Sequence, residues 1–300
     1  RDSAALYAAS LCEDQNVPVV KDEATWEQIH SFLRPVMVHL VRCKGVLLEG
    51  VCFQNSPAWN LHPLMCEDLT LRQLSVRNPW YSQNGDGVDV ESCKNVRIED
   101  CTFDVGDDAI CMKSGKNEDG RRRGIPTENV VVSRCTVYHG HGGFVCGSEM
   151  SGGIKNIEVS DCVFIGTDVG LRFKSTRGRG GVVEDIRIKG IRMWGIPNEA
   201  LTFDMFYGGK GAGEETEEEI AARMGGTVPE VDETTPVFRN ITIEDVIATD
   251  VKTAYYFNGL PEKHIENVVL KDLYMTARQG AVVRQTDHLT EENVQIVLLD

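Results

Sequence analysis

The sequence predicts an all-β fold in which short parallel strands wind into a solenoid, a parallel β-helix. A short unit recurs along the chain, its third position is usually Asn, and its ninth position is an aliphatic residue or Cys. A period in the twenties with short alternating strands is typical of a β-solenoid in which each repeat forms one coil. Leucine-rich repeats share that period, but their leucines at fixed offsets are absent here.

The spacing of the repeats locates two insertions. Successive units are separated by 23, 27, 34, 27, 29, 55, 27 and 26 residues, and the two long steps contain residues 116–126 and 208–236. The first insertion carries three consecutive arginines at 121–123, and the second is Gly-rich and acidic. Insertions leave a solenoid as loops that commonly shape its groove. The units begin at residues 43, 66, 93, 127, 154, 183, 238, 265 and, in a truncated last copy, 291.

Two positions of the unit predict how the coils stack. Asn tolerates the left-handed backbone that a tight corner needs, and stacked amides can hydrogen-bond from coil to coil. The third position holds Asn95, Asn129, Asn156, Asn240, Asn267 and Asn293, with Asp68 and Asp185 in two other copies. The ninth position, expected to face inward, holds Val51, Leu74, Cys101, Cys135, Cys162, Ile191, Val246, Leu273 and Leu299. Cysteines that replace Val and Leu in register are expected to be free and buried, although neighbouring pairs could be bridged.

The chain divides into an N-terminal segment, residues 1–37, with a short capping helix at 22–33, and a β-helix at residues 38–300 that contains both insertions. It has 300 residues, a formal net charge of −15, and no apolar run long enough to span a membrane. That charge argues against a nucleic acid partner. Because no signal-like segment opens the sequence, we expect a mature form or a fragment.

The chemistry is expected in the Gly-rich stretch at residues 84–114, which carries Asp86, Asp107 and Asp108. Serines at 92, 114, 148 and 175 mark equivalent positions in another strand of successive coils. Counting back from these serines places His141, Arg172 and Lys174 beside the aspartates, on coils stacked about 4.8 Å apart. Carboxylates held close together cannot all ionise easily, so one of the adjacent pair 107 and 108 is expected to keep a proton and act as a general acid.

Two further features complete this expected site. The adjacent Asp107 and Asp108 can both reach a groove only if the backbone turns there, which Gly106 permits. Arg172 and Lys174, two residues apart, share one face of a strand and offer two cations to an anionic ligand. The cluster therefore combines an acid, a base and an anion clamp.

These residues resemble the polygalacturonases of glycoside hydrolase family 28. The family's Asn-Thr-Asp-Gly is matched by Asn-Gly-Asp-Gly at 84–87, its Gly-Asp-Asp by 106–108, its Gly-His-Gly by 140–142, and its Arg-Ile-Lys by Arg-Phe-Lys at 172–174. A family tyrosine that follows is similar to Tyr207. The resemblance covers residues 35 to 300 and implies a right-handed parallel β-helix that cleaves α-1,4 bonds between galacturonate units of pectin, without cofactor or metal.

The resemblance also implies the roles of the site residues. Asp107 is the general acid, and Asp86 and Asp108 position and deprotonate the attacking water with inversion. From its exposed position between two glycines, His141 is expected to hold the proton of Asp107. Carboxylates one coil apart, about 5 Å, are closer to the spacing of retaining enzymes, so the inversion comes from the family alone. Substrate contacts are expected from Asn84, Arg172, Lys174, Tyr207 and, by its nearness in sequence, Glu149.

Two departures from the family pattern bear on the mode of attack. Gly85 replaces the usual threonine, a feature associated with bacterial exo-acting members, and the usual N-terminal coils are not recognisable. The insertions at 116–126 and 208–236 are expected to wall off one end of the groove, with the arginines at 121–123 meeting the terminal sugar's carboxylate. Together these features favour release of mono- or digalacturonate from chain ends.

Other functions are compatible with a β-solenoid. A pectate-lyase-like enzyme would need a calcium-binding carboxylate set and a basic proton acceptor. An adhesin would explain the repeats without the clustered Asp, His, Arg and Lys. A rhamnogalacturonan hydrolase is disfavoured by the intact Gly-His-Gly and Arg-x-Lys. We expect a secreted or periplasmic hydrolase whose partner is polygalacturonate.

Overall fold

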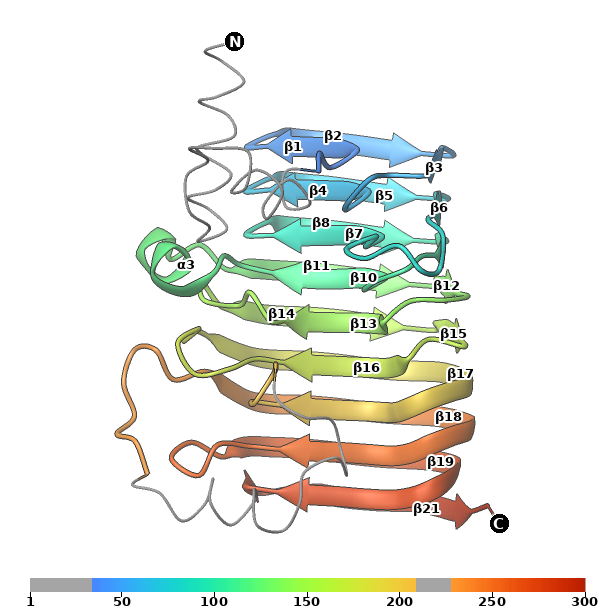
Figure 1. Cartoon of the computed structure of the whole chain (residues 1–300), viewed down its shortest axis with the longest axis vertical. Helices are drawn as coiled ribbons and strands as arrows, with labels where there is room; N and C mark the ends of the chain where they lie inside the picture. Colours follow the sequence, from blue (N-terminus) through green and yellow to red (C-terminus); the bar gives the residue numbers. More distant parts are fainter. Residues whose placement is uncertain (1–33, 209–227, 300) are drawn as a thin grey trace, which may run out of the picture.

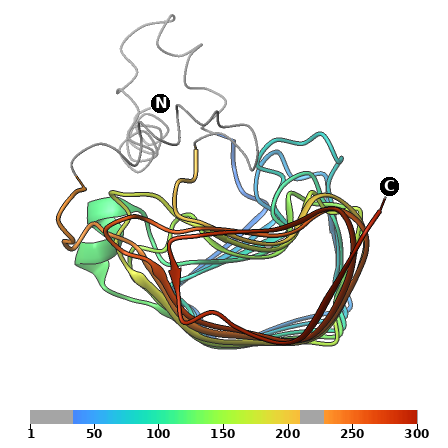
Figure 2. The same cartoon turned by 90° about the horizontal axis from the view of Figure 1, so that it is seen from below.

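In the computed structural model, which describes residues 34–208 and 228–299, the chain winds into a right-handed parallel β-helix (Figures 1 and 2). Every strand pairing among these residues is parallel, which confirms the predicted fold class. The expected helix at 22–33 lies outside the described residues. No helix in the described ranges combines the length and the apolar character that a membrane crossing needs.

Each coil contributes one strand to each of three sheets. The first sheet contains β1 (Val38–Val41), β4 (Leu61–Leu64), β7 (Val88–Glu91), β10 (Ile110–Lys113), β13 (Gly142–Gly147) and β16 (Val169–Lys174). The second contains β2 (Lys44–Glu49), β5 (Glu67–Arg72), β8 (Lys94–Glu99), β11 (Thr127–Ser133) and β14 (Ile154–Ser160). The third contains β3 (Cys52–Gln54), β6 (Ser75–Arg77), β9 (Thr102–Asp104), β12 (Thr136–Val137) and β15 (Val163–Ile165).

In the C-terminal half the strands run without a break around the coil. The first of these long strands pairs with β14, β15 and β16 in turn and so extends all three sheets. A single described helix, α3 (Asn117–Arg123), leaves the solenoid after β10 (Figure 1). The remaining strands are β17 (Val182–Asp204), β18 (Val237–Asn258), β19 (Ile265–Arg284), β20 (Thr286–Asp287) and β21 (Thr290–Leu298).

The asparagine positions form the expected ladder. Asn95, Asn129 and Asn156 have φ angles of 57°, 57° and 55°, in the left-handed region. The amide of Asn156 donates to the side-chain oxygen of Asn129 over 2.7 Å, and that of Asn129 donates to Asn95 over 3.0 Å. The side-chain hydrogen bonds offset the backbone cost at every corner. The prediction of a stacked amide ladder is confirmed.

The interior is filled by stacked apolar side chains. The rings of Phe173 and Phe203 lie parallel with centroids 4.3 Å apart, and they come from adjacent coils. Cys101, Cys135 and Cys162 are each at most 1% exposed in the ninth-position stack. All cysteines among the described residues are free and most are buried, as expected. Burial raises the pKa of the Cys146 thiol, which belongs to the same interior.

The alignment of the last repeat was wrong. Val294, not Leu299, lies opposite Leu273, and the amide of Asn293 donates to Asp272 rather than joining the Asn ladder. The final coil is shorter than its neighbours, so the inward-facing position comes earlier in the sequence than the repeat spacing predicts. Leu299 is therefore 37% exposed instead of stacked inward. Val51, on the first described coil, is 43% exposed, because the stack buries a side chain only where a coil covers it on each side.

Candidate active site

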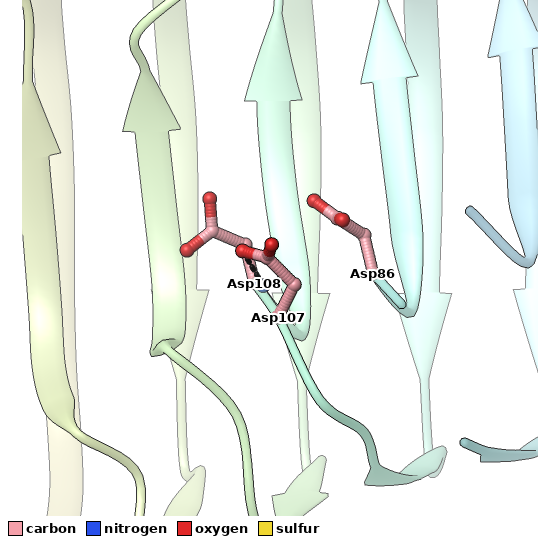
Figure 3. Close-up of side chains that lie close together, drawn as sticks. All are labelled: Asp86, Asp107 and Asp108. Carbon is pink, nitrogen blue, oxygen red and sulfur yellow. Dashed lines mark hydrogen bonds between the residues drawn. The ribbon is translucent and has the colours of Figure 1, made fainter. Parts of the chain in front are cut away.

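Three aspartates converge just before two strands of the first sheet (Figure 3). The N–H of Gly87 donates to the carbonyl oxygen of Asp108 over 2.9 Å, so Asp86 and Asp108 occupy equivalent places on successive coils. Each of Asp86, Asp107 and Asp108 offers a carboxylate oxygen within 4.8 Å of the others. Parallel stacking thus brings together residues that are 21 and 22 positions apart in sequence.

Local hydrogen bonds orient Asp107. One of its carboxylate oxygens accepts the N–H of Asp108 at 2.9 Å, and the other accepts the N–H of Asn84 at 3.1 Å. Asn84 therefore contacts the cluster through its backbone, while its side-chain oxygen accepts a hydrogen bond from Arg34. Gly106 was expected to allow a turn by its flexibility, but its φ is not in the left-handed region. It supplies space instead, since a Cβ there would lie 2.5 Å from the carbonyl oxygen of Pro79.

Asp108 is a buried carboxylate held by two cations. Its side chain is 1% exposed, 2.6 Å from the Lys174 ammonium and 3.5 Å from the Arg172 guanidinium. Burial alone would raise the pKa of Asp108, but these two cations outweigh it and hold the pKa below its ordinary value. The expected pair of basic residues is therefore present, and the carboxylate it contacts is the protein's own.

Asp86 has the opposite electrostatics. It is 3% exposed, and no ion pair among the described residues includes it. Burial raises the pKa of Asp86 well above its ordinary value, and the negative charges of Asp89 and Asp107 raise it further. Burial thus favours a proton on Asp86, a carboxyl for which the sequence did not predict one.

A groove with a volume of about 780 Å³ runs beside the aspartates. It is lined by Asp107 and His141, and the N–H of His141 donates to the carbonyl oxygen of Asp107 over 3.0 Å. The imidazole was expected to hold the proton of Asp107, but its Nε2 lies 3.7 Å from the carboxylate of Asp168, which also lines the groove. Sequence analysis missed Asp168, although it stands seven residues before Ser175, the register that located Asp107 and His141.

Tyr207 joins the two basic residues. Its ring centroid lies 4.8 Å from the Lys174 ammonium and 5.7 Å from the central carbon of the Arg172 guanidinium. The Lys174 side chain is 6% exposed, that of Arg172 is 19% exposed, and Tyr207 is 38% exposed. Of the two cations, Arg172 is thus the more accessible to a ligand.

Glu149 belongs to a separate ionic cluster. Its carboxylate lies 2.8 Å from the ammonium of Lys113, which is 5% exposed and also 3.6 Å from Asp89. Burial would raise the pKa of Glu149, but the charge and hydrogen bond of Lys113 hold it below its ordinary value. The carboxylate of Glu149, which was expected to contact the substrate, thus forms an ion pair with Lys113.

The first insertion does not lie where the wall of the groove was expected. Helix α3 follows the end of β10 (Figure 1), whereas Asp107 and Asp108 precede the start of that strand. The helix and the aspartates therefore lie at opposite ends of β10. The Arg121 guanidinium donates to the carbonyl oxygen of Gly178 over 2.7 Å, and Arg123 pairs with Glu91 at 2.9 Å. Most of the second insertion lies outside the described residues.

The three aspartates are also the one group of His, Cys, Asp or Glu side chains, within the described ranges, whose geometry could hold a metal ion. Lys174 and Arg172 already compensate the charge of Asp108, however, and burial favours a proton on Asp86. Two of the three possible ligands are therefore engaged, so the residues present fit proton transfer better than cation binding.

Comparisons with known proteins agree with this geometry. The model of the family "Glycosyl hydrolases family 28" matches residues 21–293. A probable polygalacturonase of Vitis vinifera is 29% identical over 296 residues, 91% of this chain and 56% of that protein. An endo-polygalacturonase of Pectobacterium carotovorum subsp. carotovorum is 28% identical over 245 residues, 81% of this chain and 53% of that protein.

A solved structure is similar over nearly the whole chain. The hyperthermoactive exopolygalacturonase of Thermotoga maritima superposes with a TM-score of 0.80 at 30% identity, covering 98% of this chain and 61% of that protein. The chain thus spans a little over half the length of the curated relatives described here.

Proposed function

The chain belongs to the glycosyl hydrolases of family 28, and from this premise we propose that it hydrolyses α-1,4 bonds between galacturonate units of polygalacturonate with inversion. The observation that supports this most strongly is the carboxylate cluster, in which a groove-lining Asp107 lies beside Asp86 and Asp108. A glycosidase needs one carboxylic acid to protonate the leaving oxygen and a carboxylate to activate water.

The roles follow from the exposure and charge of each carboxyl. Asp107 lines the groove and is the general acid that protonates the glycosidic oxygen. Asp108, held ionised by Lys174 and Arg172, is the base that takes a proton from the attacking water. Asp86, whose proton burial favours, donates a hydrogen bond that positions the same water. His141, which also lines the groove, orients the substrate there.

The substrate's carboxylate binds at Arg172 and Tyr207. The Arg172 guanidinium is the more exposed cation, and it faces the Tyr207 ring. A planar guanidinium matches a carboxylate in two hydrogen bonds, which favours galacturonate over a neutral sugar. Lys174 contributes by holding Asp108 ionised. Asn84 holds Asp107, and Glu149 acts through Lys113 rather than on the substrate.

Attack from chain ends and a secreted or periplasmic location are part of the proposal. The similar Thermotoga maritima structure is an exopolygalacturonase, whereas the Pectobacterium relative is an endo-polygalacturonase. Because α3 lies at the far end of β10 from the aspartates, the exo mode is supported instead by the similarity to the Thermotoga maritima exopolygalacturonase, with its TM-score of 0.80, and by Gly85.

Chromatography of the products formed from polygalacturonate over time, with viscosity followed in parallel, tests the proposal. We expect mono- or digalacturonate from the first minutes and a slow fall in viscosity. A ladder of long oligomers with a rapid fall would show endo attack instead. Unsaturated, ultraviolet-absorbing products whose formation stops when a chelator is added would show a lyase and contradict the proposed hydrolysis.

A further inference from the structure

An exposed pair of aromatic side chains lies beside the candidate site. Trp80 is 74% exposed and Tyr81 is 71% exposed, and their rings meet edge to face with centroids 5.7 Å apart. Large aromatic side chains so exposed lose the stabilisation that burial would give them, which favours a binding role. Both residues line the same groove of about 780 Å³ as Asp107 and His141.

The loop that carries them is the longest at its corner of this part of the solenoid. Ten residues, 78–87, separate β6 from β7, whereas five, 105–109, separate β9 from β10 and four, 138–141, separate β12 from β13. Strands of adjacent coils stay in register, so the extra residues must project from the corner. The loop therefore brings Trp80 and Tyr81 out to the mouth of the groove.

Hydrogen bonds hold this loop in one conformation. The N–H of Ser82 donates to the carbonyl oxygen of Pro79 over 2.9 Å, and the N–H of Gly85 donates to that of Ser82 over 3.0 Å. Asn78 accepts the N–H of Ser56 at 2.9 Å, and the Arg34 guanidinium donates to the carbonyl oxygen of Gln83 over 2.8 Å. A loop fixed at both ends presents its aromatic rings with little entropy left to lose on binding.

Two glycines make room for the loop. A Cβ on Gly85 would lie 2.5 Å from the Ser82 hydroxyl oxygen, and a Cβ on Gly106 would lie 2.5 Å from the carbonyl oxygen of Pro79. The glycine that replaces threonine in the Asn-Gly-Asp-Gly motif thus has a steric cause. It allows the loop bearing Trp80 and Tyr81 to fold back against the catalytic segment.

We propose that Trp80 and Tyr81 form an aromatic platform that binds the ring of a galacturonate unit adjacent to the bond positioned at Asp107, an inference that rests on the proposed function. A galacturonate ring carries an axial oxygen at C4, which leaves C–H groups at C3, C4 and C5 together on one face. Such an apolar face stacks on an aromatic ring while the hydroxyls and carboxylate stay in water.

The platform also has the position that a chain-shaped ligand requires. Trp80 and Tyr81 stand in the same loop as Asp86, and the groove that they line extends past Asp107 to Asp168, which immediately precedes the strand of Arg172. The groove therefore crosses several coils, with the aromatic pair and Asp107 both on its wall. A polysaccharide that lies in this groove passes the aromatic pair as well as Asp107.

Calorimetric titration of trigalacturonate into the catalytically inactive Asp107→Asn protein tests the platform. Adding Trp80→Ala is expected to weaken binding about tenfold, and adding Tyr81→Ala several-fold, because the stacking surface is lost. Trp194→Ala is the matched control, since Trp194 is 62% exposed on β17 and does not line the groove. Trp80→Phe keeps a ring and is expected to retain most of the affinity.

The outcomes separate the platform from the proposed function. If the Asp107→Asn parent binds trigalacturonate and the Trp80→Ala and Tyr81→Ala forms bind it equally well, the platform is overturned while the proposed function stands. If the parent does not bind trigalacturonate and the wild type releases no galacturonate, both are overturned. Thermal unfolding midpoints within about 2 °C of the parent's show that a loss of affinity is not a loss of folding.

Discussion

Two corners of the same solenoid stack Asn or Asp side chains from coil to coil, and they behave in opposite ways. At the corner that begins the second sheet, Asn95, Asn129 and Asn156 form a ladder in which Asn156 donates to Asn129 and Asn129 donates to Asn95. At the corner that begins the first sheet, Asp86 and Asp108 stack in the same manner but only accept hydrogen bonds when ionised. The amides thus hydrogen-bond to one another, whereas ionised carboxylates repel each other.

The difference shows how one stacking geometry serves either stability or chemistry. Neutral amides at the coil spacing gain a hydrogen bond for each coil added. Carboxylates at that spacing must be neutralised by cations, as Asp108 is, or by a proton, as Asp86 is. The first sheet thus accepts an electrostatic cost at one corner, and the result is two neighbouring carboxyls with different proton affinities.

The largest expected effect concerns the groove-lining carboxylate. Asp107→Asn should lower kcat on polygalacturonate about 10²- to 10⁴-fold, because an amide cannot protonate the leaving oxygen. Thermal unfolding should change little, since Asp107 contributes no ion pair among the described residues. Full activity in this variant would remove Asp107 from the role of acid. A variant that unfolds would show that Asp107 stabilises the fold, as the Asn ladder does.

The ladder should respond in the reverse sense. Asn129→Ala removes two side-chain hydrogen bonds and places Ala at a φ of 57°, so we expect a loss of about 2–3 kcal/mol in unfolding free energy. Activity per folded molecule should stay within about twofold. Asn129→Gly, which accepts that φ, isolates the hydrogen bonds and should cost less than the Ala variant. An active-site defect in a stably folded Asn129→Ala protein would break the division between the two corners.

Lys174→Ala should shift the pH dependence of catalysis. The ammonium opposes burial in setting the pKa of Asp108, so its removal raises that pKa. Because the base must be ionised, the acidic limb of the kcat/KM profile should move to higher pH. Lys189→Ala, which removes a 64% exposed lysine, is the control. An unmoved limb in Lys174→Ala would show that Asp108 is not the titrating base.

The smallest expected effect is a gain in stability. Burial raises the pKa of Asp86, so the folded protein binds that proton more tightly than the unfolded chain, and ionisation at higher pH costs stability. Asp86→Asn removes the ionisable group, so the variant should be more stable than the wild type by roughly 1 kcal/mol at neutral pH. The difference in stability should narrow as the pH falls toward the ordinary pKa of an aspartate, where the unfolded chain also binds the proton. A less stable Asp86→Asn variant at neutral pH would mean that neighbouring groups stabilise the negative charge of Asp86 in the folded protein.

The sequence predicted those features that repeat with the coil. The Asn ladder, the buried cysteines and the approach of Asp86, Asp107 and Asp108 all follow from fixed residue spacing in stacked coils. Asp168 lay in the same register as His141 and could have been found by the same count. The last coil was misaligned because a shortened coil slides the pattern, which only the strand pairing reveals.

Features that depend on where a loop goes could not be predicted. Residues 116–126 were recognisable as an insertion, but nothing in the sequence said that α3 lies at the far end of β10 from Asp107. The loop that carries Trp80 and Tyr81 gave no periodic signal, and the steric role of Gly85 depends on its fold. Asp86 favours a proton because it is buried. Burial cannot be read from the sequence, in which the adjacent Asp107 and Asp108 are the more conspicuous pair.

The central claim is that the carboxylate cluster hydrolyses galacturonosidic bonds with inversion, and proton nuclear magnetic resonance of polygalacturonate during digestion tests it most directly. The anomeric proton of the first product reports its configuration before mutarotation mixes the two forms. We predict saturated product in the β configuration, formed by wild type and not by Asp107→Asn. First product in the α configuration would show retention, in agreement with the close carboxylate spacing, and would contradict the assignment of Asp108 as the base.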